Sequence, residues 1–169
     1  MSISDDFLRY PDPRLAQKAE ARPVDAPMLA VGARLMAAAE RAQAYGLVAV
    51  HIGAVEPVVV ISISDTGQRD YRLVYNPRVI STGAEEQLGR EGSVSLPGIE
   101  VEISRPVSAR IGFDDETGQG QEIELSGFAA RVAQHEIDQV NGVFFLNRVS
   151  RLKREAALRR FAKLERRLG

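Results

Sequence analysis

The sequence predicts an α+β fold, in which short strands pack on a central helix and one further helix lies near each end of the chain. Three patterns support this prediction. Asp25 precedes a segment rich in Ala, Leu and Met (26–44), short β-branched or alternating runs fill residues 46–125, and apolar residues recur at helical spacing over 127–140. We therefore expect a central helix against mixed or antiparallel sheets.

The individual elements follow from local signals. Asp25 is a good N-cap and Pro27 suits a first helical turn, so a helix is expected to run to residue 44. Residues 46–53 are small and form a loop or strand, residues 85–92 are polar and form a loop, and Ser150 caps a last helix ending near residue 168. Strands are expected at 58–63, 71–75 (ended by Asn76-Pro77), 99–103, 106–114, 122–125 and 144–146.

Length and composition limit the possibilities. A chain of 169 residues predicts one domain, with a core over 1–150 and a helix over 151–169. Cysteine is absent, which excludes disulfides, thiolate ligands and a cysteine nucleophile, and only His51 and His135 supply imidazoles. There is no apolar run long enough to span a membrane and no export signal, so we expect a cytoplasmic protein.

Charge is unevenly distributed along the chain. Residues 148–167 hold nine basic residues against Glu155 and Glu165, a net charge of +7. Residues 1–147 hold 13 basic and 21 acidic residues, a net charge of −8. The last helix is therefore basic. Its charges form either a solvated face, with Leu152, Ala156, Phe161, Leu164 and Leu168 packing on the body, or a surface that contacts phosphates.

The central helix carries the most informative motif, Gln134-His135-Glu136-Ile137-Asp138-Gln139. A His-Glu-x-x-His run places two imidazoles on one helix face, where they can hold a metal ion, and the glutamate acts as general base. Here Gln139 occupies the position of the second histidine. The motif is therefore a degenerate metallohydrolase helix.

Four blocks in order make the chain resemble a peptide deformylase over nearly its whole length. They are Tyr10-Pro-Asp-Pro-Arg-Leu15, Ala44-Tyr-Gly-Leu-Val-Ala-Val-His-Ile-Gly53, Glu91-Gly-Ser-Val-Ser-Leu-Pro-Gly98 and Gln134-His-Glu-Ile-Asp-Gln-Val-Asn-Gly-Val-Phe144. The resemblance implies a deformylase-like fold and an enzyme that removes formyl groups from N-terminal formyl-methionine during translation.

The resemblance also implies roles for particular residues. The family's metal is held by a cysteine and two histidines, which correspond to Ser93, His135 and Gln139, so that only His135 matches. Glu136 corresponds to the family's base. The residues that stabilise the developing oxyanion correspond to His51, where the family has glutamine, and to the backbone of Val94.

We therefore expect a deformylase-like protein with a degenerate metal site and little or no activity. We expect it to have no cofactor or, if it has one, a divalent iron, zinc or nickel ion at His135. The plain alternative is a metal-free hydrogen-bonding network of Gln139, Ser93 and His51. A sharper alternative is an active hydrolase whose metal site is rebuilt from His51, His135 and Glu136. A third is metal-free hydrolysis with Ser93 as nucleophile and a histidine as its base.

The resemblance implies partners as well. The cleft would pair with formyl-methionyl or other peptide N-termini by β-addition, through the expected peptide-binding residues Gly46, Val48, Gly98, Ile99 and Glu100. The basic C-terminal helix would contact the ribosome. We expect no membrane and no DNA partner.

Overall fold

A computed structural model describes residues 6–168 and confirms the predicted α+β class. Three α-helices are present in this range: α1 (Ala26–Ala42), α2 (Gly127–Val140) and α3 (Arg151–Leu168). Three short 3₁₀ helices also occur, η2 (Pro13–Ala16), η3 (Ala49–Ile52) and η4 (Phe145–Arg148). The strands are β1 (Gly46–Val48), β2 (Val58–Ser62), β3 (Tyr71–Thr82), β4 (Glu86–Glu91), β5 (Val101–Pro106), β6 (Ser108–Asp114) and β7 (Gly120–Ser126).

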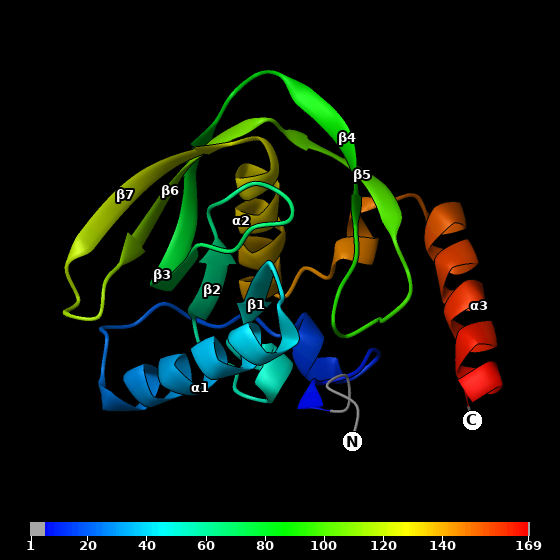
Figure 1. Ribbon diagram of the computed structural model, residues 1–169, viewed down its shortest axis with the longest axis horizontal. Coiled ribbons are helices and arrows are strands. Elements are labelled where there is room, and N and C mark those ends of the chain that lie inside the picture. The colour runs from blue at the N-terminus through cyan, green and yellow to red at the C-terminus, as the bar shows by residue number, and fades with distance from the viewer. Residues whose placement is uncertain (1–5, 169) are drawn as a thin grey trace.

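The strands form two antiparallel sheets, shown in Figure 1. Five strands make one sheet in the order β1-β2-β3-β6-β7, while β4 and β5 form a separate pair. Helix α2 contacts strands of both sheets and is the central element of the fold. Every strand pairing is antiparallel, so the mixed sheet that the sequence also allowed is not found among the described residues.

Strand β2 is buried on both faces because a helix covers each side of the sheet there. Val59 and Ile61 join the apolar cluster that includes α2, whereas Val58 and Val60 join the cluster that includes Met28 and Leu35 of α1. Successive side chains of a strand point to opposite faces, so an unbroken β-branched run suits this position. The buried strand predicted at 58–63 is confirmed.

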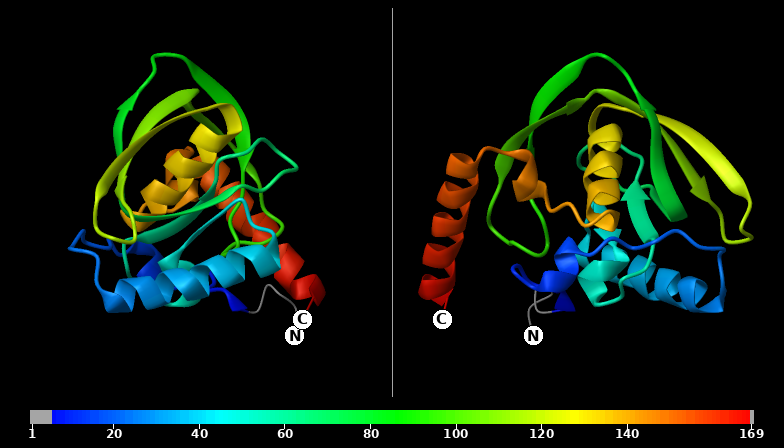
Figure 2. Two further views of the ribbon diagram at one scale, coloured as in Figure 1. Left: turned by 60° about the vertical axis from the view of Figure 1, so that its left-hand side comes forward. Right: turned by 180° about the vertical axis from the view of Figure 1, so that it is seen from behind.

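A third apolar cluster joins the β4–β5 pair to the C-terminal part of the chain. It contains Leu96, Val101 and Ile103 together with Phe144–Leu146 and two residues of α3, Ala157 and Phe161. Figures 1 and 2 show α3 at the edge of the molecule, beyond the β4–β5 pair. Leu152 and Leu168 were expected to pack on the body, but they are 74% and 88% exposed. Ala157 and Phe161 instead form the buried face of α3.

The predicted helix starts are confirmed by side-chain caps. Asp25 accepts a hydrogen bond from the Met28 amide at 2.9 Å, and Ser150 accepts one from the Lys153 amide at 3.2 Å. None of the helices within residues 6–168 combines the length and apolar character needed to cross a membrane.

Three predicted elements differ from the structure. Residues 85–92 were expected to be a loop, but β4 pairs with β5 along its whole length, because cross-strand pairing overrides weak local propensity. Asn76-Pro77 was expected to end a strand, but β3 continues through a bulge in which Asn76 has φ 49°. Residues 144–146 were expected to be a strand, but the chain turns into η4 instead.

Candidate active site

Helix α2 presents two rows of side chains to a cavity. Phe128, Val132 and Glu136 are spaced four residues apart and so lie above one another, and Arg131 and His135 form the neighbouring row. Gly46 of β1 lies directly against this helix. A Cβ atom at Gly46 would come within 2.7 Å of Glu136 Cγ, so the close approach of β1 and α2 requires glycine here.

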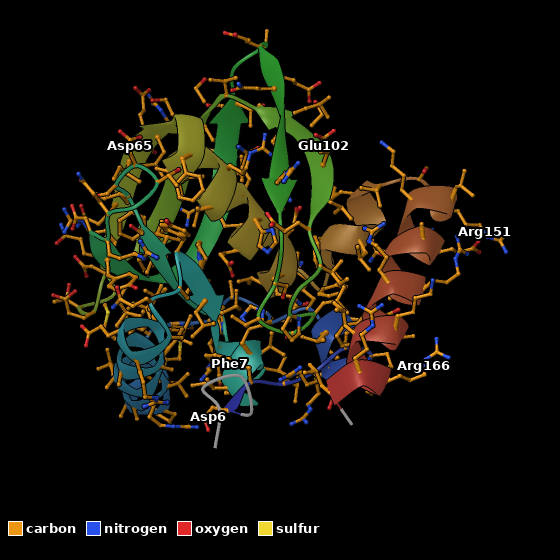
Figure 3. The ribbon with its side chains drawn as sticks, turned by 45° about the vertical axis from the view of Figure 1, so that its right-hand side comes forward. Asp6, Phe7, Asp65, Glu102, Arg151 and Arg166 are labelled. Atoms are coloured by element: carbon orange, nitrogen blue, oxygen red, sulfur yellow. The ribbon has the colours of Figure 1, made fainter. Side chains whose placement is uncertain are left out.

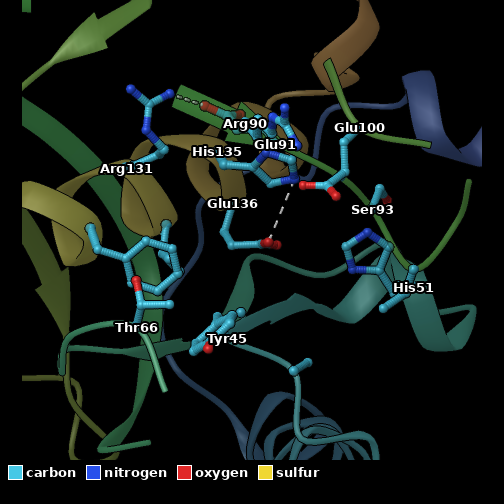
Figure 4. Close-up of a pocket in the computed structure, with 16 residues that line it drawn as sticks. Tyr45, His51, Thr66, Arg90, Glu91, Ser93, Glu100, Arg131, His135 and Glu136 are labelled. Carbon is cyan, nitrogen blue, oxygen red and sulfur yellow. Dashed lines mark hydrogen bonds and ion pairs between the residues drawn. The ribbon is translucent and has the colours of Figure 1, made fainter. Parts of the chain in front are cut away.

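The central cavity, as we call this space, has a volume of about 560 Å³. Its walls come from β1 and η3 on one side, α2 on another and residues 90–94 on a third. One end is polar, with His51, Ser93, His135 and Glu136 (Figure 4). The other end is mostly apolar and is formed by Tyr45, Thr66, Phe128 and Val132. Such a space suits an occupant with a polar head and an apolar side chain.

A buried charged cluster holds the cavity wall to the central helix. Glu91, at the end of β4, accepts hydrogen bonds from Arg105 at 2.6 and 2.9 Å and from Arg131 at 2.7 Å. His135 Nδ1 lies 2.7 Å from Glu91 Oε1, and Arg105 also bonds Asp138 at 2.9 Å. We call these five residues the Glu91 cluster. They connect β4, β5 and α2 to one another at the cavity wall, which Glu91, Arg131 and His135 help to line.

The ionisation of this cluster fixes one proton of His135. Burial alone would raise the pKa of Glu91, but hydrogen bonds from His135 and Arg105 lower it to about 2. Glu91 is therefore ionised at neutral pH and accepts the Nδ1–H of His135. Burial lowers the pKa of His135, but the bond to Glu91 and the nearby charge of Glu136 raise it overall. The Nε2 atom of His135 faces Glu136 Oε1 at 3.8 Å.

Glu136 lies at the centre of the polar end, with its carboxylate directed into the cavity (Figure 4). Burial raises its pKa to about 7, against the opposing effect of the His135 charge. Such a group exchanges protons near neutral pH, as a general base or acid must. Among residues 6–168, its Oε2 atom has no hydrogen-bond partner.

His51 is a buried and neutral donor. Its Nδ1 atom accepts a hydrogen bond from the Val48 amide at 2.9 Å within η3. Burial and the neighbouring His135 lower the pKa of His51 to about 3, so the ring carries a single proton, which must reside on Nε2. Like Glu136 Oε2, the Nε2 atom has no hydrogen-bond partner in the described part of the chain.

The side chains of Ser93 and Gln139 are both used by the fold. Ser93 Oγ accepts a hydrogen bond from the Ser95 amide at 3.1 Å. Gln139 is buried, and its Nε2 donates to the Leu15 carbonyl at 2.7 Å, which connects α2 to η2. Ser93 and His51 line the cavity, whereas Gln139 does not belong to its lining. The network of these three residues that the sequence suggested is therefore not formed as one unit.

These donors do not fit the metal that the resemblance implies. One imidazole, a neutral hydroxyl and an amide turned toward η2 replace one thiolate and two imidazoles. His51, His135 and Glu136 do all line the cavity. Within residues 6–168, however, no three His, Asp or Glu side chains are arranged as a group that could hold a metal ion.

The expected peptide-binding residues occupy different places. Gly46 and Glu100 line the cavity, as does Val94, whose backbone was expected to face an oxyanion. Val48 is buried and pairs with Val59 of β2. Ile99 is buried in the third apolar cluster, and a Cβ atom at Gly98 would meet Leu164 of α3 at 3.0 Å.

Sequence reasoning missed the residues that close the apolar end. The Tyr45 ring meets Phe128 edge-on with ring centroids 4.7 Å apart, and the Arg69 guanidinium lies 3.7 Å above the Tyr45 ring. The Tyr45 hydroxyl accepts a bond from the Gly67 amide at 2.8 Å, so the β2–β3 loop is held over this end. Helical spacing from Glu136 could have revealed Phe128 and Val132, but no sequence signal pointed to the loop.

Comparison with known families agrees with this architecture. Residues 4–155 match the family model described as polypeptide deformylase, and the chain belongs to this family of metal-dependent hydrolases. A peptide deformylase-like protein of Rhizobium meliloti is 38% identical over 162 residues, covering 95% of this chain and 92% of the relative. A peptide deformylase from the same organism is 33% identical over 155 residues, covering 90% and 89%.

The solved structures lead to the same family. A crystal structure of peptide deformylase from Ehrlichia chaffeensis matches with a TM-score of 0.85 and 28% identity, covering 95% of this chain and 96% of that chain. The deformylase 1B structure of Arabidopsis thaliana in complex with an inhibitor matches with a TM-score of 0.84 and 27% identity, covering 96% and 91%. The resemblance expected from the four sequence blocks is confirmed.

Proposed function

We propose that this protein is a deformylase-fold binding protein that holds a peptide N-terminus in the central cavity. It hydrolyses the formyl amide of that terminus very slowly or not at all. One observation carries the proposal. Gln139, at a position where the family places a metal ligand, donates its amide hydrogen to Leu15 instead. Gln139 therefore connects α2 to η2, and one of the three positions of the family's metal ligands has a structural role in this chain.

The remaining donors support weak chemistry. A serine hydroxyl at Ser93 is a poor substitute for a thiolate, because its proton is retained near neutral pH, and an amide oxygen is a weak ligand for iron, zinc or nickel. Metal coordination lowers the pKa of bound water to about 7, far below its value in bulk water. Without that shift, Glu136 has very little hydroxide to direct at an amide.

The cavity keeps the features that binding requires. Strand β1 ends the five-stranded sheet and pairs only with β2 among the described strands, so its other edge has no strand partner. Gly46 lines the cavity there, whereas the Val48 amide already donates to His51. Residues 90–94 form the facing wall. An extended peptide between these segments would gain main-chain hydrogen bonds, and its first side chain would enter the apolar end beside Tyr45 and Phe128.

The test compares binding with turnover on one sample. The protein is purified from iron- and zinc-supplemented cells under low oxygen, and its metal content is measured. It is then titrated with formyl-methionyl-alanyl-serine by calorimetry and assayed for formate release. We expect binding with little or no turnover. Absence of binding would refute the proposal, and turnover with stoichiometric metal would establish the alternative, an active metal-dependent hydrolase.

The basic face of α3 favours a second interaction, with a phosphate-bearing partner. We propose that this partner is the ribosome and that the protein is therefore cytoplasmic. Ala157 and Phe161 face the body, which leaves the cations on the outer side, and Figure 3 shows Arg151 and Arg166 directed away from the molecule. The exposed cations of this helix are Arg151, Lys153, Arg159, Arg160, Lys163, Arg166 and Arg167. We propose that this face contacts the phosphates of ribosomal RNA.

Charge reversal tests the contact with ribosomes. The substitutions Arg159→Glu, Lys163→Glu and Arg166→Glu lie on exposed positions, so the fold should be unaffected. We expect the triple variant to lose co-sedimentation with ribosomes, and the unmodified protein to lose it as salt is raised. A triple reversal at Arg34, Arg41 and Arg72, exposed positions outside α3, is the matched control. Equal co-sedimentation of both variants would contradict the proposed contact.

A further inference from the structure

Two separate spaces share the side chain of Arg131 as a wall. The first is the central cavity, which Phe128 and Arg131 line from adjacent turns of α2. The second, which we call the outer pocket, has a volume of about 210 Å³ and lies between residues 87–89, residues 105–107 and the start of α2. Phe128 and Arg131 line the outer pocket as well. Side chains that line both spaces stand between them.

The guanidinium of Arg131 is held in one position by two strands. Its Nη1 atom donates to Glu91 Oε2 at 2.7 Å and to the Ile103 carbonyl at 2.8 Å. Its Nη2 atom donates to the Gln87 carbonyl at 2.6 Å. The guanidinium is planar and its donors form a rigid fork, so three bonds to β4 and β5 fix its orientation. The wall is therefore well defined, although a long side chain forms it.

Strand β4 has a glycine where this guanidinium lies. Gly89 and Glu91 point to the same face of β4, because successive side chains of a strand alternate, and both are in contact with Arg131. A Cβ atom at Gly89 would come within 2.7 Å of Arg131 Cζ, which is closer than real Cβ atoms approach. The backbone of Gly89 does not adopt a positive φ, so its conformation does not require glycine. The side chain of Arg131 is what requires it.

The wall limits the depth of the apolar end of the central cavity. An unbranched apolar side chain that enters beside Tyr45 and Phe128 has Arg131 as its next neighbour along α2. Atoms in a packed wall leave no room for further groups, so the chain cannot pass into the outer pocket. Side chains that end before Arg131 fit, whereas additional methylene groups gain no apolar contact.

We infer that Arg131 determines the length of the first side chain that the cavity accepts, by closing the apolar end against the outer pocket, and that Gly89 makes room for it. The inference rests on the proposed function and concerns the side chain of the bound peptide. Arg131 acts here as a specificity-determining residue through its bulk, and its three bonds keep that bulk in place.

The first test varies the length of the first side chain. Three formylated peptides that end in alanyl-serine are prepared, with alanine, norleucine or hexylglycine at the first position, and each is titrated into the full-length protein by calorimetry. The unmodified protein should bind the hexylglycine peptide no more tightly than the norleucine peptide. In Arg131→Ala the longer chain can enter the outer pocket. Each added methylene should then strengthen binding about fourfold, so the ratio of the two affinities should rise roughly tenfold or more.

A double variant then separates bulk from bonding. Gly89→Val in the Arg131→Ala chain places a side chain where the guanidinium was, and valine suits a strand. This variant lacks all three Arg131 bonds but restores the wall, so the ratio should return close to that of the unmodified protein. Circular dichroism and the unfolding midpoint establish that both variants are folded. Glu91 keeps Arg105 and His135 as partners in each of them.

A variant from the opposite side keeps the inference testable if Arg131→Ala does not fold. Gly89→Ala in the unmodified chain adds a Cβ atom behind the guanidinium and pushes it toward the central cavity. The preference for the norleucine peptide over the alanine peptide should then fall severalfold. An unchanged preference in this folded variant would overturn the role of Arg131.

The outcomes separate this inference from the proposed function. If none of the three peptides binds the unmodified protein, both are overturned. If the peptides bind but Arg131→Ala has the same ratio as the unmodified protein, peptide binding stands and Arg131 does not limit side-chain length. If the ratio rises in Arg131→Ala and stays high in the double variant, the bonds of Arg131 matter rather than its bulk, and the inference is wrong.

Discussion

Replacing Arg105 with methionine probes the part of the structure that shapes the cavity. The Arg105 side chain is 5% exposed and donates three hydrogen bonds, two to Glu91 and one to Asp138. Methionine fills a similar volume but leaves those acceptors short of partners. Removing one member of a buried ion pair costs about 3–5 kcal/mol. Because Glu91 keeps Arg131 and His135, and Asp138 keeps Arg148, we expect the lower end, about 3 kcal/mol.

Equilibrium unfolding in urea, followed by circular dichroism, measures this change directly. For a domain of this size, a loss of about 3 kcal/mol should also lower the midpoint of thermal unfolding, followed by the same signal, by roughly 6–12 °C. Arg110→Met is the matched control, because Arg110 pairs with Glu122 and Glu124 but is 46% exposed. An exposed pair is worth about 0–1 kcal/mol, so the control should change little. Equal losses in the two variants would refute the argument that burial makes the Glu91 cluster strong.

Three further predictions follow from the site. The double variant Ser93→Cys/Gln139→His completes the ligand set with His135, so it should bind close to one zinc or nickel ion per chain, measured by mass spectrometry. A double variant without metal would mean that the local geometry no longer suits a metal. The lowered pKa of Glu91 contributes stability that is fully present above pH 4.5 and is lost as the pH falls through about 2. This contribution to the free energy of unfolding is about 3 kcal/mol, and acid unfolding curves measure it. A Glu91→Gln variant with the same slope over this range would show that other carboxylates cause the loss. Phe161→Ala should destabilise the protein by about 3 kcal/mol, because it removes the buried aromatic side chain that packs α3 on the body. Leu152→Ala, at an exposed position of the same helix, should have almost no effect in the same urea titration.

The sequence predicted those elements whose signals are local. The cap at Asp25, the β-branched run of β2 and the helical spacing of α2 each depend on a few adjacent residues, and all three were confirmed. Strand β4 was missed because its glycine and polar side chains disfavour a strand locally, and only the pairing with β5 stabilises it. The bulge at Asn76 was missed for the same reason, since its side chain is held by bonds to Arg22 and Asp114 across the fold.

The candidate site shows the same division. The resemblance carried by the four sequence blocks placed His51, Ser93, His135 and Glu136 at one site, and all four line the central cavity. It could not show that Gln139 turns to Leu15, because the two residues are 124 positions apart in the chain. Nor could it show which ring nitrogen of His51 bears the proton, since that depends on the backbone geometry of η3. Hydrogen bonds between distant segments therefore decided what the motif alone left open.

The Glu91 cluster holds the walls of the cavity without two of the three positions at which the family places metal ligands, residues 93 and 139. Its bonds connect β4, β5 and α2 through side chains, and none of them involves residue 93 or 139. A substitution at either position therefore leaves these braces in place, and the walls keep their spacing. The cavity can therefore keep its shape when residues 93 and 139 are substituted, and it can bind a different ligand afterwards. The same independence makes this chain a suitable starting scaffold for installing a different catalytic group by design.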